Sequence, residues 1–228
     1  MTIKYRYEHK YHLDITRMND LIYKLTKVLN LDPHSQDGSY QVTSLYFDTI
    51  FNELYYEKLE GLEKREKIRI RVYNHSDKVI NLELKGKHNN GVYKQRIKIS
   101  IDEYHQILNG DYDFLLNKGK YGEKFYWKFK TMNLQPKVVI DYERTAFLIP
   151  LTDIRITFDY HLKGGPNDAL FKNMANASIL KDRIVVLEIK GSNDIPRYVK
   201  DLVKGYGQLT ANSKYALALE QIRKGELV

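Results

Sequence analysis

The segment Lys67-Ile68-Arg69-Ile70-Arg71-Val72-Tyr73 constrains the fold most, because aliphatic residues alternate in it with basic residues and a final tyrosine. A period of two predicts a β-strand with one aliphatic face and one cationic face. A strand at a solvated sheet surface has the same pattern, so this segment alone does not show where its cations point.

The same alternation recurs along the chain. Segments with this pattern are 6–11, 82–85, 93–99, 142–146, 154–159 and 186–190. Such a sheet either turns its cationic face to water or encloses that face as a lumen. The recurrence favours the lumen, because helices outside the sheet need an apolar face to pack on. Eight strands close into a barrel that side chains or one small ligand can fill.

The periodicity predicts the order of the elements. Strands are expected at 4–12, 40–48, 65–73, 79–86, 92–100, 136–148, 153–161 and 183–190. Helices are expected at 16–30, within 49–64 and 102–132, at 195–209 and at 214–223. Asp14 or Thr16 is expected to cap the first helix and Asp102 a later one. Loops are expected at 32–39 and 163–168, and a hairpin turn at Asn90-Gly91.

These elements predict an α+β fold, an eight-stranded antiparallel β-barrel with flanking helices. The 228 residues contain no internal repeat, low-complexity tract or linker, so a single domain is expected over residues 1–228.

Composition excludes several classes of protein. The 37 basic and 29 acidic residues give a net charge of +8, which favours anionic partners. The absence of cysteine excludes disulfides and thiolate metal sites. The N-terminus lacks an apolar signal region, and the apolar runs fall far short of the ~20 residues of a membrane helix. A soluble, cytoplasmic protein is therefore expected. Motifs of the GxxxxGK[ST], GxGxxG and HExxH types are absent.

A cationic lumen predicts the ligand chemistry. It would be lined by Lys10, Arg69, Arg71, Lys85, Lys94, Arg96, Arg144, Arg155 and Lys190. Burying an unpaired ion costs several kcal/mol, so the lumen needs water and counter-ions, or a polyanion. Each charge-assisted hydrogen bond to phosphate contributes on the order of 1.5–3 kcal/mol. Glu8, Glu83 and Glu188 would orient the cations as salt-bridge partners, or bind a divalent cation that bridges phosphates; the sequence leaves both roles open.

An ordered set of motifs resembles the VTC domain, the vacuolar transporter chaperone polyphosphate polymerase domain. This family is a branch of the triphosphate tunnel metalloenzymes, or CYTH-like superfamily, and the resemblance is to a stand-alone member of bacterial type. The motifs are Tyr7-Glu8-His9-Lys10-Tyr11, Ser44-Leu45-Tyr46-Phe47-Asp48-Thr49, 67–73, Leu82-Glu83-Leu84-Lys85, 142–147, 154–159, Leu187-Glu188-Ile189-Lys190 and Ser213-Lys214-Tyr215. They span nearly the whole chain in order.

The resemblance implies an eight-stranded tunnel that transfers the terminal phosphate of ATP to a growing polyphosphate chain, with Mn²⁺ or Mg²⁺. ATP and inorganic polyphosphate would be the partners. Catalytic contacts to phosphate are assigned to Lys10, Arg69, Arg71, Lys85, Arg144 and Arg155. Further phosphate binding is assigned to Lys94, Arg96, Lys190 and Lys214, and metal binding to Glu188 and Glu8. The acceptor phosphate attacks, so catalysis needs positioning and charge neutralisation rather than a protein nucleophile.

One departure from the superfamily pattern bears on the activity. The superfamily often begins with ExExK, but Arg6 occupies the first position here. The missing carboxylate weakens the two-metal hydrolase interpretation and fits the polymerase branch. The alternatives are a tunnel triphosphatase acting on tripolyphosphate or nucleotides, and a non-catalytic polyphosphate-binding module. Nucleic-acid binding would need the cations outside the barrel and is not expected; a membrane-protein partner that receives the polymer stays open.

Overall fold

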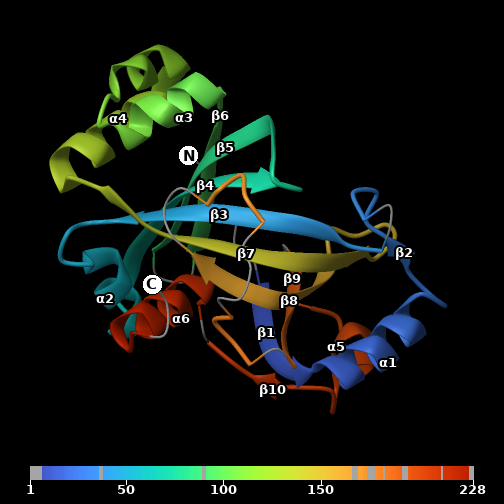
Figure 1. Ribbon diagram of the computed structural model, residues 1–228. Coiled ribbons are helices and arrows are strands. Elements are labelled where there is room, and N and C mark those ends of the chain that lie inside the picture. The colour runs from blue at the N-terminus through green and yellow to red at the C-terminus, as the bar shows by residue number, and fades with distance from the viewer. Residues whose placement is uncertain are drawn as a thin grey trace.

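The computed structural model is organised around one strongly curved antiparallel sheet of ten strands (Figure 1). The structure describes residues 7–35, 38–88, 91–165, 169–173, 178–181, 183–191, 195–211 and 213–225. The strands are β1 (Tyr7–Asp14), β2 (Asn30–Leu31), β3 (Tyr40–Asp48), β4 (Lys64–Tyr73), β5 (Ser76–His88), β6 (Gly91–Ile99), β7 (Gln135–Leu148), β8 (Arg155–Gly165), β9 (Ile184–Gly191) and β10 (Gln208–Leu209). Their hydrogen-bonded order is β10-β1-β9-β8-β7-β3-β4-β5-β6, and β2 pairs with β7.

The predicted α+β class with an antiparallel sheet is confirmed. The eight predicted strands all exist, and within the described part of the chain the prediction missed the two-residue strands β2 and β10. The two ends of the sheet approach each other through side chains, since Lys85 Nζ of β5 lies 2.8 Å from Glu8 Oε2 of β1. Arg6 and the residues 89–90 of the expected hairpin turn lie outside the described residues.

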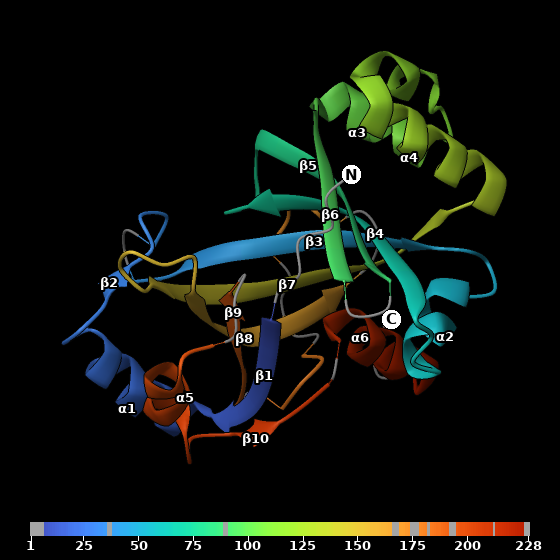
Figure 2. The ribbon, with the colours of Figure 1, turned by 180° about the vertical axis from the view of Figure 1, so that it is seen from behind.

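Helices pack against both faces of this sheet (Figures 1 and 2). They are α1 (Ile15–Leu25), α2 (Glu53–Leu59), α3 (Ile101–Leu108), a 3₁₀ helix η1 (Asp113–Lys118), α4 (Gly119–Met132), α5 (Arg197–Val203) and α6 (Lys214–Arg223). Helix α6 lies against the inner face, where its Tyr215 stacks on Tyr46 of β3. Helices α3 and α4 pack on the aliphatic face of β3–β5, around the buried residues Ile70, Leu82 and Phe129. Helices α1 and α5 pack on β1, β8 and β9, around Leu21, Leu187 and Val199. The aliphatic half of the alternation therefore forms the outer cores.

The structure has one of the two predicted helix caps. Asp14 caps α1, because its Oδ1 accepts from the backbone N–H of Thr16 at 2.9 Å. The prediction that Asp102 caps a helix is wrong. Ser100 caps α3 in a capping box, in which Glu103 Oε2 accepts from the Ser100 backbone N–H at 2.8 Å.

Two predicted helices were too long, because sheet pairing replaces helix at their ends. Helix α1 ends at Leu25, and Asn30–Leu31 pairs with β7 instead of continuing the helix. Helix α5 ends at Val203, Gly205 follows with φ +83°, and β10 then pairs with β1. Residues 163–165 of the expected loop belong to β8, and 166–168 lie outside the described residues. Among the described helices, none has the length and apolarity needed to span a membrane.

Candidate functional site

A cavity of about 750 Å³ lies on the inner face of the curved sheet. The inward residues of successive strands are aligned by register, as in the row Tyr46, Arg69, Glu83 across β3, β4 and β5. Eleven Lys and Arg side chains line the cavity: Lys10, Lys58, Arg65, Lys67, Arg69, Arg71, Lys85, Lys87, Arg144, Lys190 and Lys214. The acidic lining residues are Glu8 and Glu188. The alternation therefore concentrates positive charge in one enclosed space.

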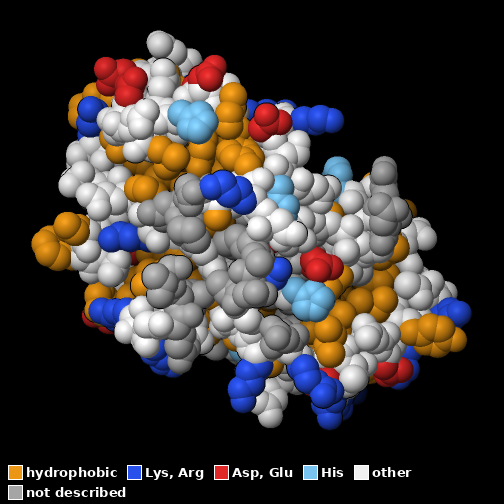
Figure 3. Space-filling model, in the orientation of Figure 1, with side chains coloured by type: hydrophobic (Ala, Val, Ile, Leu, Met, Phe, Trp, Pro, Cys, Tyr) orange, Lys and Arg blue, Asp and Glu red, His pale blue; other side chains and the backbone are white. Residues whose placement is uncertain are grey.

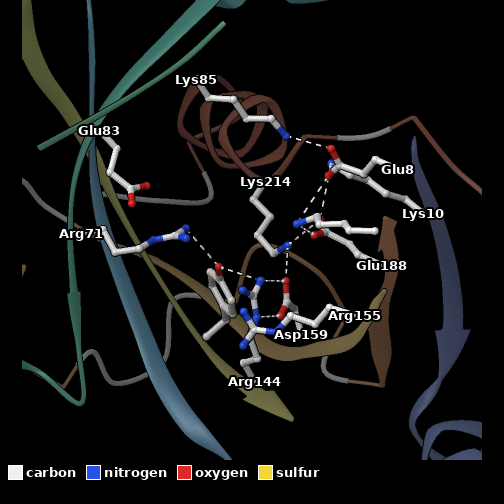
Figure 4. Close-up of polar contacts among 12 residues, drawn as sticks. Glu8, Lys10, Arg71, Glu83, Lys85, Arg144, Arg155, Asp159, Glu188 and Lys214 are labelled. Atoms are coloured by element: carbon white, nitrogen blue, oxygen red, sulfur yellow. Dashed lines mark hydrogen bonds and ion pairs between the residues drawn. The ribbon is translucent and has the colours of Figure 1, made fainter. Parts of the chain in front are cut away.

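Glu8 and Glu188 hold the lysines on one side of this cavity (Figure 4). Glu8 lies 3.4 Å from Lys10 Nζ and 2.8 Å from Lys85 Nζ. Glu188 lies 3.4 Å from the same Lys10 Nζ and 2.5 Å from Lys190 Nζ. Burial alone would raise the pKa of Glu8, but Lys190, Lys85 and Lys10 outweigh it and lower that pKa well below its usual range. Both groups are therefore carboxylates at neutral pH, since lysines also lower the pKa of Glu188.

Asp159 forms a second anionic centre at the inner end of the cavity. It accepts from Arg144 Nε at 2.6 Å and Arg144 Nη2 at 2.7 Å, and Lys214 Nζ lies 2.6 Å away. Burial opposes the charge of Lys214, but Asp159 and Glu188 outweigh it and raise the pKa of Lys214. Figure 4 shows Arg144, Asp159 and Arg155 on the side of the cluster away from Lys85 and Glu8.

Helix α6 brings Lys214 into the cavity at its first turn. Ser213 caps the helix, and its Oγ also accepts from Lys67 Nζ at 2.5 Å. Tyr215, on the next position, donates to buried Asp48 at 2.6 Å. Asp48 in turn accepts from the backbone N–H groups of Leu54 and Tyr55 at the start of α2. This chain of hydrogen bonds fixes α6 against α2 and thereby places the Lys214 ammonium group.

Arg69 and Arg71 differ in how their charges are balanced. Arg69 donates to Glu83 Oε2 through Nε at 2.9 Å and Nη2 at 2.8 Å. Glu83 also pairs with Lys94 at 2.6 Å. Arg71 donates to neutral oxygens, Ser44 Oγ at 2.9 Å and the Tyr142 hydroxyl at 3.2 Å, and it contacts no carboxylate among the described residues. Its positive charge is therefore available to an anionic ligand.

Lys67 is a second cation without a carboxylate partner among the described residues. Burial lowers its pKa well below the usual value, and nearby Lys10 and Lys85 lower it further. An anionic ligand beside Lys67 would raise this pKa again, because it supplies a negative charge that offsets both effects. Lys67 was not among the predicted site residues, although it shares the alternating face of Arg69 and Arg71.

Most of the predicted site residues come together. Those that line the cavity are Lys10, Arg69, Arg71, Lys85, Arg144, Lys190, Lys214, Glu8 and Glu188. Lys94 lies beside the cavity on Glu83, and Arg96 is exposed on β6. Arg155 pairs instead with Asp32 and donates to the Tyr40 hydroxyl at 2.7 Å. The phosphate-binding roles of these residues remain predictions.

Sequence reasoning missed several cavity residues. They are Lys58, Arg65, Lys67, Lys87, Tyr46, Tyr142 and Ser213, together with Asp159, which pairs with two lining cations. The period of two contained a signal for Asp159, since it shares a face of β8 with Arg155. Lys58 had no such signal because it lies on α2.

The carboxylate pair fits a divalent cation held jointly with phosphate. Glu8 and Glu188 lie on adjacent strands, face the cavity and share the Lys10 ammonium group. Among the described residues, no group of three or more His, Asp or Glu side chains is placed to hold a metal ion. Mg²⁺ commonly takes one or two carboxylates and completes its shell with water and substrate phosphate oxygens. The donor set here matches that arrangement.

The outer surface gives a contrast to the cavity. On the face shown in Figure 3, Lys and Arg side chains lie in small separate groups between hydrophobic and neutral side chains. The inward cluster on the strands, by contrast, places its cations within hydrogen-bonding reach of shared carboxylates. The described cavity therefore suits a narrow polyanion as its ligand better than a nucleic-acid duplex.

Comparison with known proteins gives a family and a shared fold. The family model of the VTC domain matches residues 5–223. The PH1819 protein from Pyrococcus horikoshii superposes with a TM-score of 0.54 at 12% identity, covering 96% of this chain and 98% of the other. A comparison with curated proteins gave no significant match.

Two further solved structures share this fold. A putative adenylyl cyclase from Hippeastrum, described as having a dominant triphosphatase activity, superposes with a TM-score of 0.56 at 15% identity, covering 97% and 96% of the two chains. A putative adenylate cyclase from Bacillus halodurans superposes with a TM-score of 0.58 at 13% identity, covering 91% and 93%.

Proposed function

This chain belongs to the VTC domain family, and from that premise we propose that it is a metal-dependent polyphosphate polymerase. It would transfer the terminal phosphoryl group of ATP to a growing inorganic polyphosphate chain inside the basic cavity. The eight long strands would form the wall of a triphosphate tunnel, with β1 and β5 meeting at the Glu8–Lys85 ion pair. Delivery of the polymer to a membrane protein is a further prediction of this proposal.

The observation that carries the proposal is the excess of basic over acidic side chains in one cavity, eleven against two among the residues that the structure describes. Two of those cations, Lys67 and Arg71, have only neutral partners among the described residues. A buried positive charge without a negative partner costs free energy, and a bound anion reduces this cost. A row of phosphates supplies several negative charges at close spacing, so a linear triphosphate matches the cavity.

The residues would act by binding and orienting phosphates. Arg71 and Lys67 bind oxygens of the ATP triphosphate, while Arg144 and Lys214 contact its terminal phosphate. The bridging P–O bond to the terminal phosphorus breaks, an acceptor oxygen forms the new P–O bond, and ADP leaves with the bridging oxygen. Glu8 and Glu188 would hold the divalent cation, which would neutralise charge on the phosphate oxygens.

Product analysis tests the proposal. Purified protein incubated with ATP and Mn²⁺ should release ADP and accumulate a long phosphate polymer, which gel electrophoresis and ³¹P NMR detect. ADP and free phosphate without polymer would rule out polymerase activity. Binding of ATP and polyphosphate without any turnover would indicate a binding module instead.

A triphosphatase is the second candidate. A protein of the same fold from Hippeastrum is described as having a dominant triphosphatase activity. Both activities require the triphosphate to be bound in the same way, and they differ in the acceptor. The acceptor is water for a triphosphatase and a phosphate oxygen for a polymerase. The product analysis separates them, because hydrolysis yields free phosphate as the main product.

A further inference from the structure

A separate row of cations lines the cavity beyond the residues assigned above to the triphosphate. It consists of Lys58 of α2, Arg65 near the start of β4 and Lys87 near the end of β5. Their side chains are half-buried, and Arg65 directly follows the exposed residues 59–64. These three cations therefore lie where the cavity meets solvent. We call them the outer row.

The register of β4 and β5 shows how the outer row continues the inner one. Arg65 lies opposite Lys87, and two residues further along both strands Lys67 lies opposite Lys85. Two residues of an antiparallel strand advance by roughly 6.8 Å. Side chains two positions apart share a face of the sheet, so the outer row extends the same cationic surface by one repeat beyond Lys67.

The outer row has no carboxylate partner within the described part of the chain. Arg65 donates to the Leu62 carbonyl at 2.8 Å, and neither Lys58 nor Lys87 forms an ion pair there. Burial lowers the pKa of Lys58, and nearby Arg65, Lys10 and Lys87 lower it further. Like charges directly opposite one another destabilise a sheet. A bound anion between Arg65 and Lys87 would replace this repulsion by attraction.

The lining of the cavity near the outer row suits phosphate better than a nucleobase. Two tyrosines line the cavity among the described residues, and they lie against inner arginines, Tyr46 against Arg69 and Tyr142 against Arg144. No other Phe, Tyr or Trp side chain belongs to the described lining. Unpaired bases bind proteins largely by stacking on aromatic rings, whereas Lys and Arg bind phosphate oxygens. The outer row therefore offers contacts for further phosphates.

From these observations we propose that the outer row is a subsite for the part of an inorganic polyphosphate chain that extends beyond the three phosphates held by the inner cations. In the proposed binding mode of ATP, this row lies beyond Lys67 on the side of ADP. A chain bound there competes with the adenosine of ATP and not with the acceptor. A long polymer therefore displaces ATP more strongly than tripolyphosphate does, and it limits synthesis as product accumulates. This inference rests on the proposed function, because it takes the inner ligand to be a row of phosphates.

Calorimetric titration in metal-free buffer tests the proposal on the wild-type protein. Tripolyphosphate and linear hexapolyphosphate have the same end groups and differ in length. We expect hexapolyphosphate to bind at least about tenfold more tightly and to displace ATP at a correspondingly lower concentration. Equal affinities would overturn the outer subsite. Failure of both ATP and tripolyphosphate to bind would instead overturn the proposed function.

A variant without the outer row gives the second measurement. It combines Lys58→Gln, Arg65→Gln and Lys87→Gln and retains every inner cation. A longer chain also has more ways to place three of its phosphates on the inner cations, but this gain is the same for both proteins. We therefore expect the ratio of hexapolyphosphate to tripolyphosphate affinity to fall at least about fivefold in the variant.

A matched control removes the same number of charges outside the cavity. It combines Lys78→Gln, Arg197→Gln and Lys204→Gln, three exposed positions that do not line the cavity. This control should keep the wild-type ratio. An unchanged ratio in the folded outer-row variant, or an equal fall in the control, would contradict the assigned subsite.

Discussion

Replacement of Arg71 by methionine separates ligand binding from folding stability. Arg71 lines the cavity, is 6% exposed, and donates only to Ser44 Oγ and the Tyr142 hydroxyl among the described residues. The variant loses at least one charge-assisted hydrogen bond to phosphate, which contributes on the order of 1.5–3 kcal/mol. Tripolyphosphate should therefore bind about 10- to 150-fold more weakly. Calorimetric titration without metal measures this change directly.

The unliganded variant should be about as stable as the wild type. Removing a buried charge that lacks a carboxylate partner relieves repulsion, so the Tm should fall by no more than about 3 °C. Arg144→Met should behave differently, because it leaves buried Asp159 with Lys214 as its remaining cation. Breaking a buried pair costs on the order of 3–5 kcal/mol, which lowers the Tm by roughly 6–20 °C.

A matched control keeps this comparison specific. Arg197 has a 94% exposed side chain on α5, so Arg197→Met should leave the tripolyphosphate affinity unchanged. The reasoning is refuted if folded Arg71→Met binds tripolyphosphate within about threefold of the wild type, since a free inward charge would then contribute nothing.

Three further predictions concern metal, pH and ligand. Glu188→Gln should reduce Mn²⁺-dependent turnover more than it weakens tripolyphosphate binding in EDTA; a larger loss of binding than of turnover would contradict its metal role. Burial lowers the pKa of Lys94 to about 8 despite its pairing with Glu83, so its ammonium charge is present below pH 8 and lost above it. Phosphate affinity should accordingly decline above pH 8, and Lys94→Arg should shift that decline to higher pH; superimposable pH profiles would exclude Lys94 from binding. Tripolyphosphate at about 100 times its Kd should add ~2.7 kcal/mol of stability and raise the Tm in thermal-shift measurements, whereas an unchanged Tm would argue against binding to the folded cavity.

Much of the sheet was predictable because the alternation is a local signal. Strand β4 was predicted within one residue, since one of its faces is buried with a period of two along most of its length. Strand β3 was predicted with its observed bounds, although it is buried on both faces. Helix ends were predicted less well. The apolar pattern continues past Leu25 and Val203, but pairing with β7 and β1 takes over there. That competition depends on residues distant in the chain, so local periodicity does not reveal it.

The sequence predicts which side chains belong to the site, but not which of them form ion pairs with one another. The period of two along each strand places Arg69, Arg71 and Lys85 on the cationic face of the sheet, and all three line the cavity. The partner of Lys85 is Glu8, 77 positions earlier, and only the curvature of the sheet brings the two together. Asp159 was overlooked because a single carboxylate on a basic strand resembles a surface residue. Its importance comes from Lys214 of the last helix, which the strand pattern does not include.

The pairing of charges divides the cavity cations by role. Lys10, Lys190 and Lys214 are held by carboxylates, so a phosphate gains from them only what remains after it competes with Glu8, Glu188 and Asp159. Arg71 and Lys67 have neutral partners among the described residues and bind an anion without breaking an ion pair. The affinity for a phosphate chain should therefore depend chiefly on these two cations of β4. The carboxylate-bound cations, held in fixed positions, determine which phosphate of the chain lies beside Arg144 and Lys214, and hence which bond can react.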